Sequence, residues 1–177
     1  YVVREVETPW GKSRIGTIGV TTEEGAVGGL KYVDPKETVE AAVNQLKKEG
    51  VSIFQIHSHL GLGEDIKLAQ HLVANDIKVA GIIGAHSHDA LVRPVWVGAE
   101  SKSGLARLNP FNYRNASGTM PGAAQFEIPI VQAGHSGNWL GEFSQAIKPD
   151  GTAHRFLTTS KLHEVTENLA ENPSIRK

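Results

Sequence analysis

The sequence has 177 residues, of which 40% are hydrophobic and 21% are charged, and its formal net charge is −1. This length predicts one domain, or the larger part of one, with enough apolar residues to bury a core. The lysines and arginines are dispersed, which argues against a nucleic-acid-binding surface and against a polybasic membrane patch. No apolar run reaches the ~20 residues of a membrane-spanning helix, and the lack of cysteine excludes disulfides and thiolate metal sites.

The first part of the chain predicts two strands and a capped helix. Residues 1–7 (YVVREVE) and 14–20 (RIGTIGV) read as strands, the second of them buried. The segment 34–50 predicts a helix, because Asp34 is suited to the N-cap and Pro35 to the first helical position. A chain that opens within a strand leads us to expect further residues upstream.

The next segments repeat this alternation of strand and helix. Residues 51–56 (VSIFQI) and 78–84 (KVAGIIG) are short apolar runs, which are typical of buried strands. Residues 64–76 have helical apolar spacing, and Glu64 and Asp65 fall in the first turn, where acidic residues are favoured. Strand–helix–strand–helix–strand predicts a parallel sheet with right-handed crossover connections.

After residue 91 the sequence predicts loops and antiparallel strands. The run LVRPVWVG is compatible with a strand, and residues 98–127 are rich in Gly, Ser, Asn and Pro, which predicts a loop or insertion. The runs IPIVQAG, WLGEFSQAI and AHRFLTTSKL predict antiparallel strands, with KPDG as the turn between the last two. The predicted fold class is therefore α/β over residues 1–160, followed by a polar tail or linker at 161–177.

Two His-Ser-His triplets, at residues 57–59 and 86–88, directly follow two of the predicted parallel strands. The carboxyl ends of parallel strands form the ligand-binding edge of an open α/β sheet, so we expect the two triplets to share one rim. Neutral imidazole is a common metal ligand, and three histidines are enough for a catalytic zinc site. The pattern favours a metal site, whereas a single histidine at a strand end is usually only a hydrogen-bonded polar residue.

The other histidines fit structural roles. His71 falls in the middle of a predicted helix, and His154 and His163 lie in polar strand or tail segments. His135, within QAGHSGNWLG, is interpreted as a turn residue, with contact to the shared rim as the alternative. Asp89 either orients one of the rim histidines or is a solvated loop residue.

The segments RIGTIGVTT, GVSIFQIHSHLGLGEDIKLA, IIGAHSHD and IVQAGHSGNWLG resemble, in this order and spacing, the calcineurin-like metallophosphoesterases of the 5′-nucleotidase branch. The resemblance covers roughly residues 1–160 and corresponds to the C-terminal half of that family's catalytic domain. It implies half of a four-layer α/β sandwich with two divalent metal ions, Zn or Mn, at the sheet edge. The implied activity is hydrolysis of phosphate esters, often nucleotides, by a metal-activated water.

Carried over by position, the resemblance implies that His59 and His86 bind one metal ion and that His88 binds the other. His57 lies outside the motif and is interpreted as a strand-end residue, and Ala85 stands where a second glycine is usual. The family's upstream Asp-x-His, Gly-Asp and Gly-Asn-His elements, which supply the bridging carboxylate and the catalytic histidine, are absent from this sequence. No catalytic or substrate-binding residue is therefore assigned. We expect the chain to be inactive unless the missing N-terminal half is supplied upstream or by a separate chain.

Two other functions stay open. A thiosulfohydrolase-like enzyme of sulfur oxidation shares the metal framework, but usually has His-Asn-Gly and Gly-His-Thr-His where this sequence has His-Leu-Gly and Ala-His-Ser-His. A non-catalytic structural or binding remnant of the fold would explain why the upstream ligands are missing. The resemblance and the lack of cysteine predict a periplasmic or extracellular location.

Overall fold

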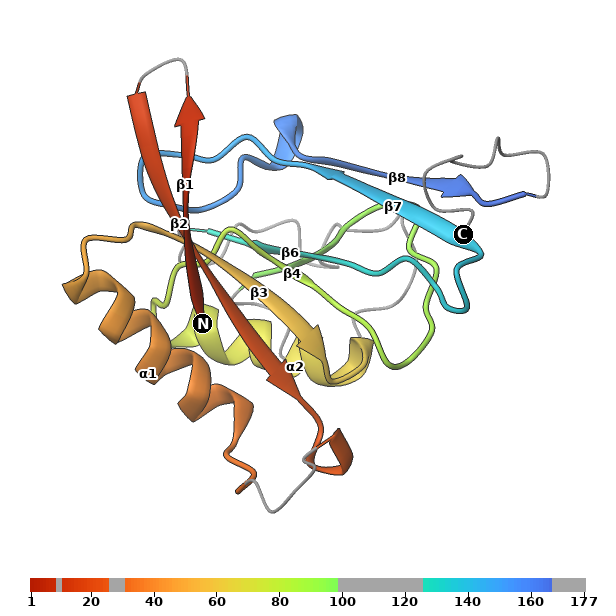
Figure 1. Cartoon of the computed structure of the whole chain (residues 1–177), viewed down its shortest axis with the longest axis horizontal. Helices are drawn as coiled ribbons and strands as arrows, with labels where there is room; N and C mark the ends of the chain where they lie inside the picture. Colours follow the sequence, from red (N-terminus) through yellow and green to blue (C-terminus); the bar gives the residue numbers. More distant parts are fainter. Residues whose placement is uncertain (9–10, 26–30, 99–125, 167–177) are drawn as a thin grey trace, which may run out of the picture.

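The computed structural model describes residues 1–8, 11–25, 31–98 and 126–166, which form a six-stranded mixed sheet, two α-helices and a separate two-stranded ribbon (Figure 1). Residues 99–125, almost all of the predicted loop, and most of the predicted tail lie outside this part of the chain. The strands of the sheet, in spatial order, are β1 (Val2–Thr8), β2 (Gly11–Thr21), β3 (Ile53–His59), β4 (Gly81–Ile83), β6 (Ile128–Val131) and β5 (Val95–Val97).

The centre of the sheet is parallel. Strands β2, β3, β4 and β6 run in the same direction, and β1 and β5 pair antiparallel with the strands beside them. The predicted parallel α/β sheet is confirmed. The prediction of antiparallel pairing was wrong for the IPIVQAG run, because β6 joins the sheet parallel to β4, and its antiparallel partner is β5 rather than a later strand. All four residues of β6 are buried, as is expected of a strand covered on both faces.

Both helices lie on one face of the sheet. Helix α1 (Pro35–Lys48) has the predicted N-cap, since the Asp34 side chain accepts a hydrogen bond of 2.7 Å from the backbone N–H of Lys36. Helix α2 (Leu62–Ala74) begins two residues earlier than the predicted 64. The residues that the helices bury against the sheet are Val39, Val43, Leu46, Leu68, Ala69 and Leu72. Together with the inward side chains of β2, β3, β4 and β6 they form the core.

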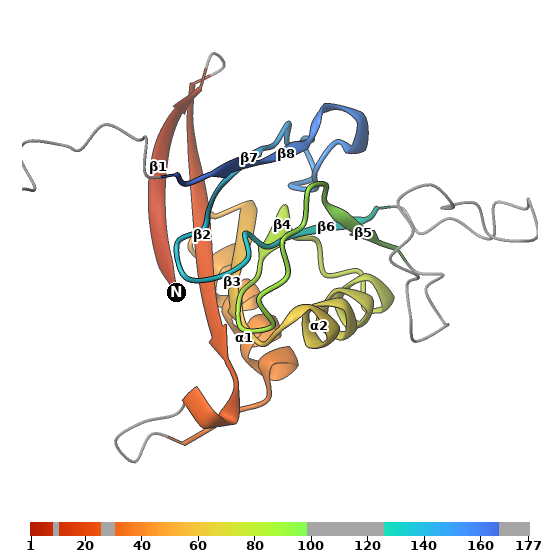
Figure 2. The same cartoon turned by 90° about the vertical axis from the view of Figure 1, so that its right-hand side faces the viewer.

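The ribbon of β7 (Trp139–Ser144) and β8 (Thr159–Glu164) lies on the other side of the sheet from the helices (Figure 2). Its antiparallel pairing is confirmed, and so is the turn at KPDG, where the N–H of Gly151 donates to the carbonyl of Lys148 over 2.9 Å. Two short 3-10 helices, Glu23–Gly25 and Arg155–Leu157, complete the described structure. None of the helices in the described ranges is long and apolar enough to cross a membrane.

Candidate functional site

The two His-Ser-His triplets lie at the carboxyl edge of adjacent parallel strands. His57 in β3 is in register with Ile83, the last residue of β4. The triplet 57–59 forms the last three residues of β3 itself, so the prediction that it follows the strand was wrong. The triplet 86–88 does follow its strand, after two intervening residues. The parallel arrangement thus brings both triplets to one edge of the sheet, as the sequence predicted.

The serine of the first triplet anchors the end of β3 to helix α2. The strand alternates, so that His57 and His59 are exposed while Ser58 is buried between them. The Ser58 hydroxyl donates to the carboxylate of Asp65 in the first turn of α2, and it accepts a 3.1 Å hydrogen bond from the N–H of Leu60. The middle residue of the triplet therefore has a structural role, and both histidines are left free to face outward.

Asp65 is a fully buried carboxylate beneath the site. Its relative exposure is 0%, and its Oδ2 has no hydrogen-bond partner in the described part of the protein. Burial raises the pKa of Asp65 to about 6; the charge of Glu64 adds to the increase, and the hydrogen bond from Ser58 opposes it. Gly84 packs so closely on Oδ2 that a side chain at position 84 would collide with it. The sequence predicts the first-turn position of Asp65 but not its burial.

The serine of the second triplet is attached to the same helix. Ser87 Oγ accepts a 2.9 Å hydrogen bond from the N–H of Leu62, the first residue of α2, and its hydroxyl donates to Asp89 Oδ2 over 2.6 Å. Asp89 therefore holds the loop through Ser87. His86 and His88 have left-handed backbone conformations, with φ of 82° and 63°. Such conformations are uncommon for residues other than glycine and are concentrated at functional sites.

Gln132, which directly follows β6, fixes this loop from the other side. Its side chain is buried, with Nε2 donating to the carbonyl of Ala85 over 3.1 Å and Oε1 accepting from the N–H of Asp89 over 2.5 Å. Ser87 Oγ also lies 3.2 Å from Gln132 Oε1. The sequence analysis did not identify Gln132. The signal that could have identified it is the presence of a polar residue at the end of a continuous apolar strand.

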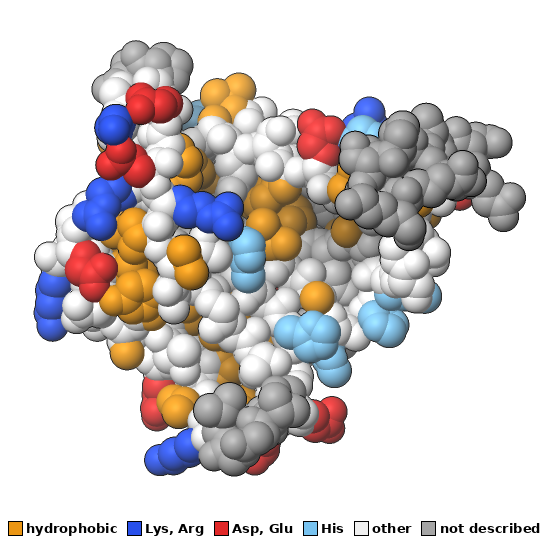
Figure 3. Space-filling model, viewed as in Figure 1, with side chains coloured by type: hydrophobic (Ala, Val, Ile, Leu, Met, Phe, Trp, Pro, Cys, Tyr) orange, Lys and Arg blue, Asp and Glu red, His pale blue; other side chains and the backbone are white. Residues whose placement is uncertain are grey.

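The histidine rings at this edge form two pairs. The ring centroids of His59 and His86 are 5.0 Å apart, with 64° between the ring planes. His88 lies against His135, with centroids 4.6 Å apart and 30° between the planes. Within the described ranges, no group of three or more His, Cys, Asp or Glu side chains is arranged to hold a metal ion. Histidine side chains gather on this face of the molecule, near the end of β3 (Figure 3).

The spacing of the first pair meets a simple requirement for shared coordination. A metal–nitrogen bond of about 2.1 Å, and a ring centre about 1.2 Å beyond the nitrogen, place the centroids of two imidazoles on one ion about 4.7–5.4 Å apart for bond angles of about 90–109°. The 5.0 Å between His59 and His86 falls in this range. Two neutral imidazoles suit zinc and other divalent transition metals, so the residues present fit part of a metal site.

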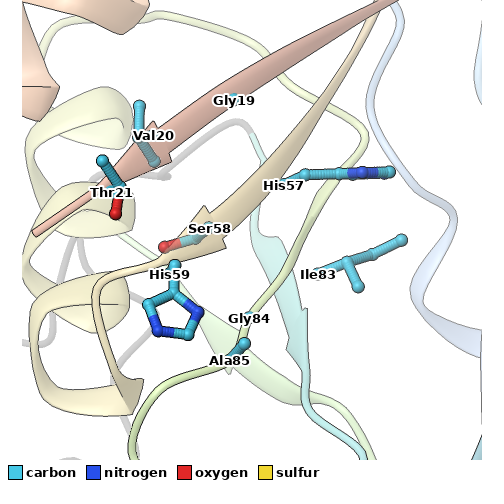
Figure 4. Close-up of a pocket in the computed structure, with 9 residues that line it drawn as sticks. All are labelled: Gly19, Val20, Thr21, His57, Ser58, His59, Ile83, Gly84 and Ala85. Carbon is cyan, nitrogen blue, oxygen red and sulfur yellow. The ribbon is translucent and has the colours of Figure 1, made fainter. Parts of the chain in front are cut away.

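An open pocket of about 500 Å³ lies beside the first pair, on the sheet face away from the helices. His57 and Ile83 project to the same side of it, next to the backbone of Gly19 on the adjacent strand (Figure 4). Ile83 is 38% exposed even though it belongs to a central strand. The remaining residues that line the pocket are Val20, Thr21, Ser58, His59, Gly84 and Ala85.

The histidines expected to be structural lie away from the triplets, with one exception. His71 Nε2 lies 2.5 Å from Glu40 Oε1 and joins the two helices, and His163 Nε2 lies 2.8 Å from Glu142 Oε2 across the ribbon. His154 directly precedes the short 3-10 helix Arg155–Leu157, and its buried Nδ1 has no hydrogen-bond partner among the described residues. The exception is His135, which occupies the predicted turn but also contacts His88 at the shared rim.

Comparison with known proteins identifies the relatives of this chain. An apyrase of Aedes aegypti is 30% identical over 159 residues, which are 85% of this chain and 26% of the apyrase. A snake venom 5′-nucleotidase of Gloydius brevicauda is 27% identical over 172 residues, which are 94% of this chain and 26% of that protein. The chain thus spans about a quarter of the length of these curated relatives. No protein-family model matches the sequence.

Two solved structures share the fold. The 5′-nucleotidase precursor from Thermus thermophilus superimposes with a TM-score of 0.62 at 23% identity, covering 92% of this chain and 29% of that one. The NAD nucleotidase of Haemophilus influenzae gives a TM-score of 0.58 at 16% identity, covering 94% and 34%. The fold is that of one part of a 5′-nucleotidase-type α/β sandwich. The predicted resemblance to 5′-nucleotidase-type metallophosphoesterases is confirmed, because the chain is similar in sequence to an apyrase and a 5′-nucleotidase and shares the fold of a 5′-nucleotidase precursor.

Proposed function

We propose that this chain is the C-terminal half of the catalytic domain of a metal-dependent phosphoric ester hydrolase that acts on nucleotides. The apyrase and 5′-nucleotidase relatives support the reaction class. The observation that carries the proposal is the pairing of His59 with His86, whose ring centroids lie 5.0 Å apart at the carboxyl edge of the sheet. When bound, Zn or Mn would supply an activated water for attack on the phosphorus atom.

In this proposal His59 and His86 hold one metal ion and His88 contributes to a second. Each imidazole offers one neutral nitrogen as a ligand. Ser58 and Ser87 fix the backbone on which these histidines stand by attaching it to the start of α2. Gln132 holds the loop that carries His86 and His88 through its hydrogen bonds to Ala85 and Asp89.

Two bound metal ions need negatively charged ligands, and in this proposal these ligands come from outside the described residues. Neutral imidazoles cannot balance two divalent ions held about 3.5–4 Å apart, the usual spacing in two-metal sites. Asp65 is buried beneath the edge, and the Asp89 carboxylate is bound to Ser87. We infer that the remaining carboxylate ligands come from the missing N-terminal half, which would pack over the open sheet face beside His57 and Ile83.

Metal binding tests the site independently of activity. We expect the protein to bind Zn²⁺ or Mn²⁺ in equilibrium dialysis, and the double variant His59→Ala/His86→Ala to lose at least one ion. His163→Ala is the matched control, because His163 pairs with Glu142 on the distant ribbon. Unchanged metal stoichiometry in the double variant, with wild-type binding in the control, would contradict the assignment.

Measuring hydrolysis tests whether the missing N-terminal half is required for activity. We expect residues 1–177 alone to show negligible release of phosphate from nucleoside monophosphates. Hydrolysis should appear when the chain is produced together with the upstream region of its gene. Strong metal-dependent turnover by residues 1–177 alone would show that the missing half is not required. Inactivity of a complete, metal-loaded protein would favour the non-catalytic reading of the fold.

We also propose that the protein acts in the periplasm or outside the cell. The 5′-nucleotidase relative is a venom protein, and the sequence has no cysteine that an oxidising compartment would modify. Cell fractionation with a specific antibody measures this directly, and recovery of the protein only with cytoplasmic markers would contradict it.

A further inference from the structure

Asp65 is a fully buried carboxylate to which the proposed function gives no role. Its relative exposure is 0%, and its Oδ2 has no hydrogen-bond partner within the described ranges. A buried polar atom without a partner costs free energy, and most such atoms in folded proteins are paired. An acidic side chain at the start of a helix is favoured without being buried, so the burial of Asp65 needs a further reason.

Through one oxygen, the carboxylate holds the end of β3. Asp65 accepts the hydrogen bond from the Ser58 hydroxyl, and the oxygen of that hydroxyl accepts a 3.1 Å hydrogen bond from the N–H of Leu60. These two contacts bracket His59, which lies between Ser58 and Leu60 in the chain. With the serine held inward, the alternation of the strand directs His59 outward. Asp65 therefore fixes the segment that carries His59.

Through its other oxygen, the carboxylate contacts the segment that leaves β4. Gly84 directly follows this strand and lies so close to Oδ2 that a Cβ atom added to it would overlap with that oxygen. The N–H of Gly84 donates to the carbonyl of Val131 over 2.8 Å, so Gly84 is also attached to β6. His86 follows two residues later, and its ring pairs with that of His59. One carboxylate thus contacts both segments whose histidines form the first pair.

We propose that Asp65 is a positioning residue whose carboxylate acts as a spacer between these two segments and sets the separation of His59 and His86. The 5.0 Å between their ring centroids suits two imidazoles on one metal ion. Because the carboxylate is bonded to Ser58 and closed off from solvent, it cannot turn away from Gly84 without breaking that bond. This inference rests on the proposed metal-dependent function and concerns a residue that is not itself a proposed ligand.

The test measures the Zn²⁺ affinity of the purified protein at neutral pH. Asp65→Ala removes the spacer, and Gly84→Ala adds a methyl group that collides with it. Each should weaken binding about tenfold, as expected for residues that orient metal ligands, and should change the visible absorption of the Co²⁺-loaded protein. Asp65→Asn keeps the size of the side chain and the acceptor for Ser58, and should retain the affinity of the parent. Gly63→Ala is the matched control, because Gly63 is exposed in the same turn of α2 and nothing lies close to an added Cβ atom.

The double variant Asp65→Ala/Gly84→Ala shows whether the two residues act through one contact. Without the carboxylate, the nearest side-chain atom to the added carbon is Gln132 Nε2, at 3.3 Å. The double variant should therefore bind Zn²⁺ no more weakly than Asp65→Ala alone, whereas independent effects would multiply to about a hundredfold loss. Circular dichroism and urea denaturation of each variant separate a change in metal affinity from a loss of folded protein.

The outcomes separate this inference from the function on which it rests. Parent-like zinc affinity in Asp65→Ala would overturn the spacer role, while zinc binding by the parent protein would leave the proposed function intact. Equal losses in Asp65→Asn and Asp65→Ala would show that the charge matters and not the spacing, which also overturns the spacer role. Independent losses in the double variant would overturn it as well. A parent protein that binds no Zn²⁺ would overturn both the inference and the proposed function.

Discussion

The two faces of the sheet differ in how they are covered. On the helix side, core side chains such as Ile18, Ile56 and Ile82 are at most 1% exposed beneath α1 and α2. On the opposite side, the ribbon of β7 and β8 covers only part of the sheet, and Ile83 and His57 face an open pocket. Parallel sheets normally have both faces covered. The difference shows that, among the described residues, the close-packed core lies beneath the helices, whereas the sheet surface around Ile83 and His57 is left open.

The largest expected loss of stability comes from removing a core side chain beneath the helices. Leu46→Ala removes a fully buried side chain of α1 and should lower the free energy of unfolding by about 3 kcal/mol. Ile83→Ala on the open face should cost less than about 1.5 kcal/mol, because Ile83 is already 38% exposed. Urea denaturation measures both values. Equal losses for the two variants would mean that the open face contributes as much to stability as the covered one.

The next largest loss of stability is expected at the carboxyl edge of the sheet, where a buried glutamine holds the loop of the second triplet. Gln132→Ala removes hydrogen bonds to Ala85 and Asp89 from a buried position, and should destabilise the protein by about 2 kcal/mol. Gln45→Ala is the matched control, because the Gln45 side chain donates to the exposed Glu49 at the C-cap of α1 and its loss should change stability by less than about 0.5 kcal/mol. The same denaturation experiment applies. A Gln132 variant as stable as the control would show that the histidine loop holds its conformation without this side chain.

Replacing the buried carboxylate of Asp65 should change the free energy of unfolding by a smaller amount, and should raise it rather than lower it. The pKa of Asp65 is raised to about 6 by burial, so the folded state binds its proton more tightly than the unfolded state does. The contribution of this group to stability is therefore greatest at acidic pH and is lost as the pH rises from about 4 to about 6. Asp65→Asn should stabilise the protein by about 1–2 kcal/mol at pH 7 and by little at pH 4.

Thermal unfolding at several pH values measures this difference between Asp65→Asn and the parent. Glu37→Gln, an exposed acid in the first turn of α1, is the control and should leave the pH dependence almost unchanged. If Asp65→Asn destabilises the protein at pH 7, the ionised carboxylate has a favourable partner that burial alone does not reveal.

The smallest effect is expected on the outer surface of the helices. Glu40→Gln weakens the contact with His71, whose side chain is 30% exposed while that of Glu40 is 40% exposed. Partly exposed pairs of this kind contribute about 0–1 kcal/mol, so we expect a loss of less than about 0.5 kcal/mol. A loss comparable with that of Leu46→Ala, measured by the same denaturation, would mean that polar contacts between the helices matter as much as the core.

Local sequence patterns predict the elements of this fold better than their long-range neighbours. The cap at Asp34 and the apolar spacing that follows it predict α1, and the apolar runs before the triplets predict β3 and β4. The parallel placement of β6 was missed, because pairing with β4 depends on contacts between residues far apart in the sequence. A short apolar run is equally compatible with parallel and antiparallel partners.

The same limit applies to the candidate site. The repeated triplet predicts that His59 and His86 reach one edge, and their adjacency follows once β3 and β4 are neighbours. Gln132 and His135 belong to a segment about 45 residues further on, and no local pattern connects them with the triplets. The burial of Asp65 was also missed, because acidic residues in the first turn of a helix are usually solvated.

The common attachment of both serines to α2 has a consequence for ligand-linked dynamics. Ser58 bonds Asp65 and Ser87 bonds the N–H of Leu62, so one helical turn supports both histidine-bearing segments. Fraying of that turn would release both segments together, and an occupant of the histidine edge would oppose the fraying by mass action. Deuterium uptake at the amides of this turn therefore reports occupancy of the edge without requiring any chemical turnover.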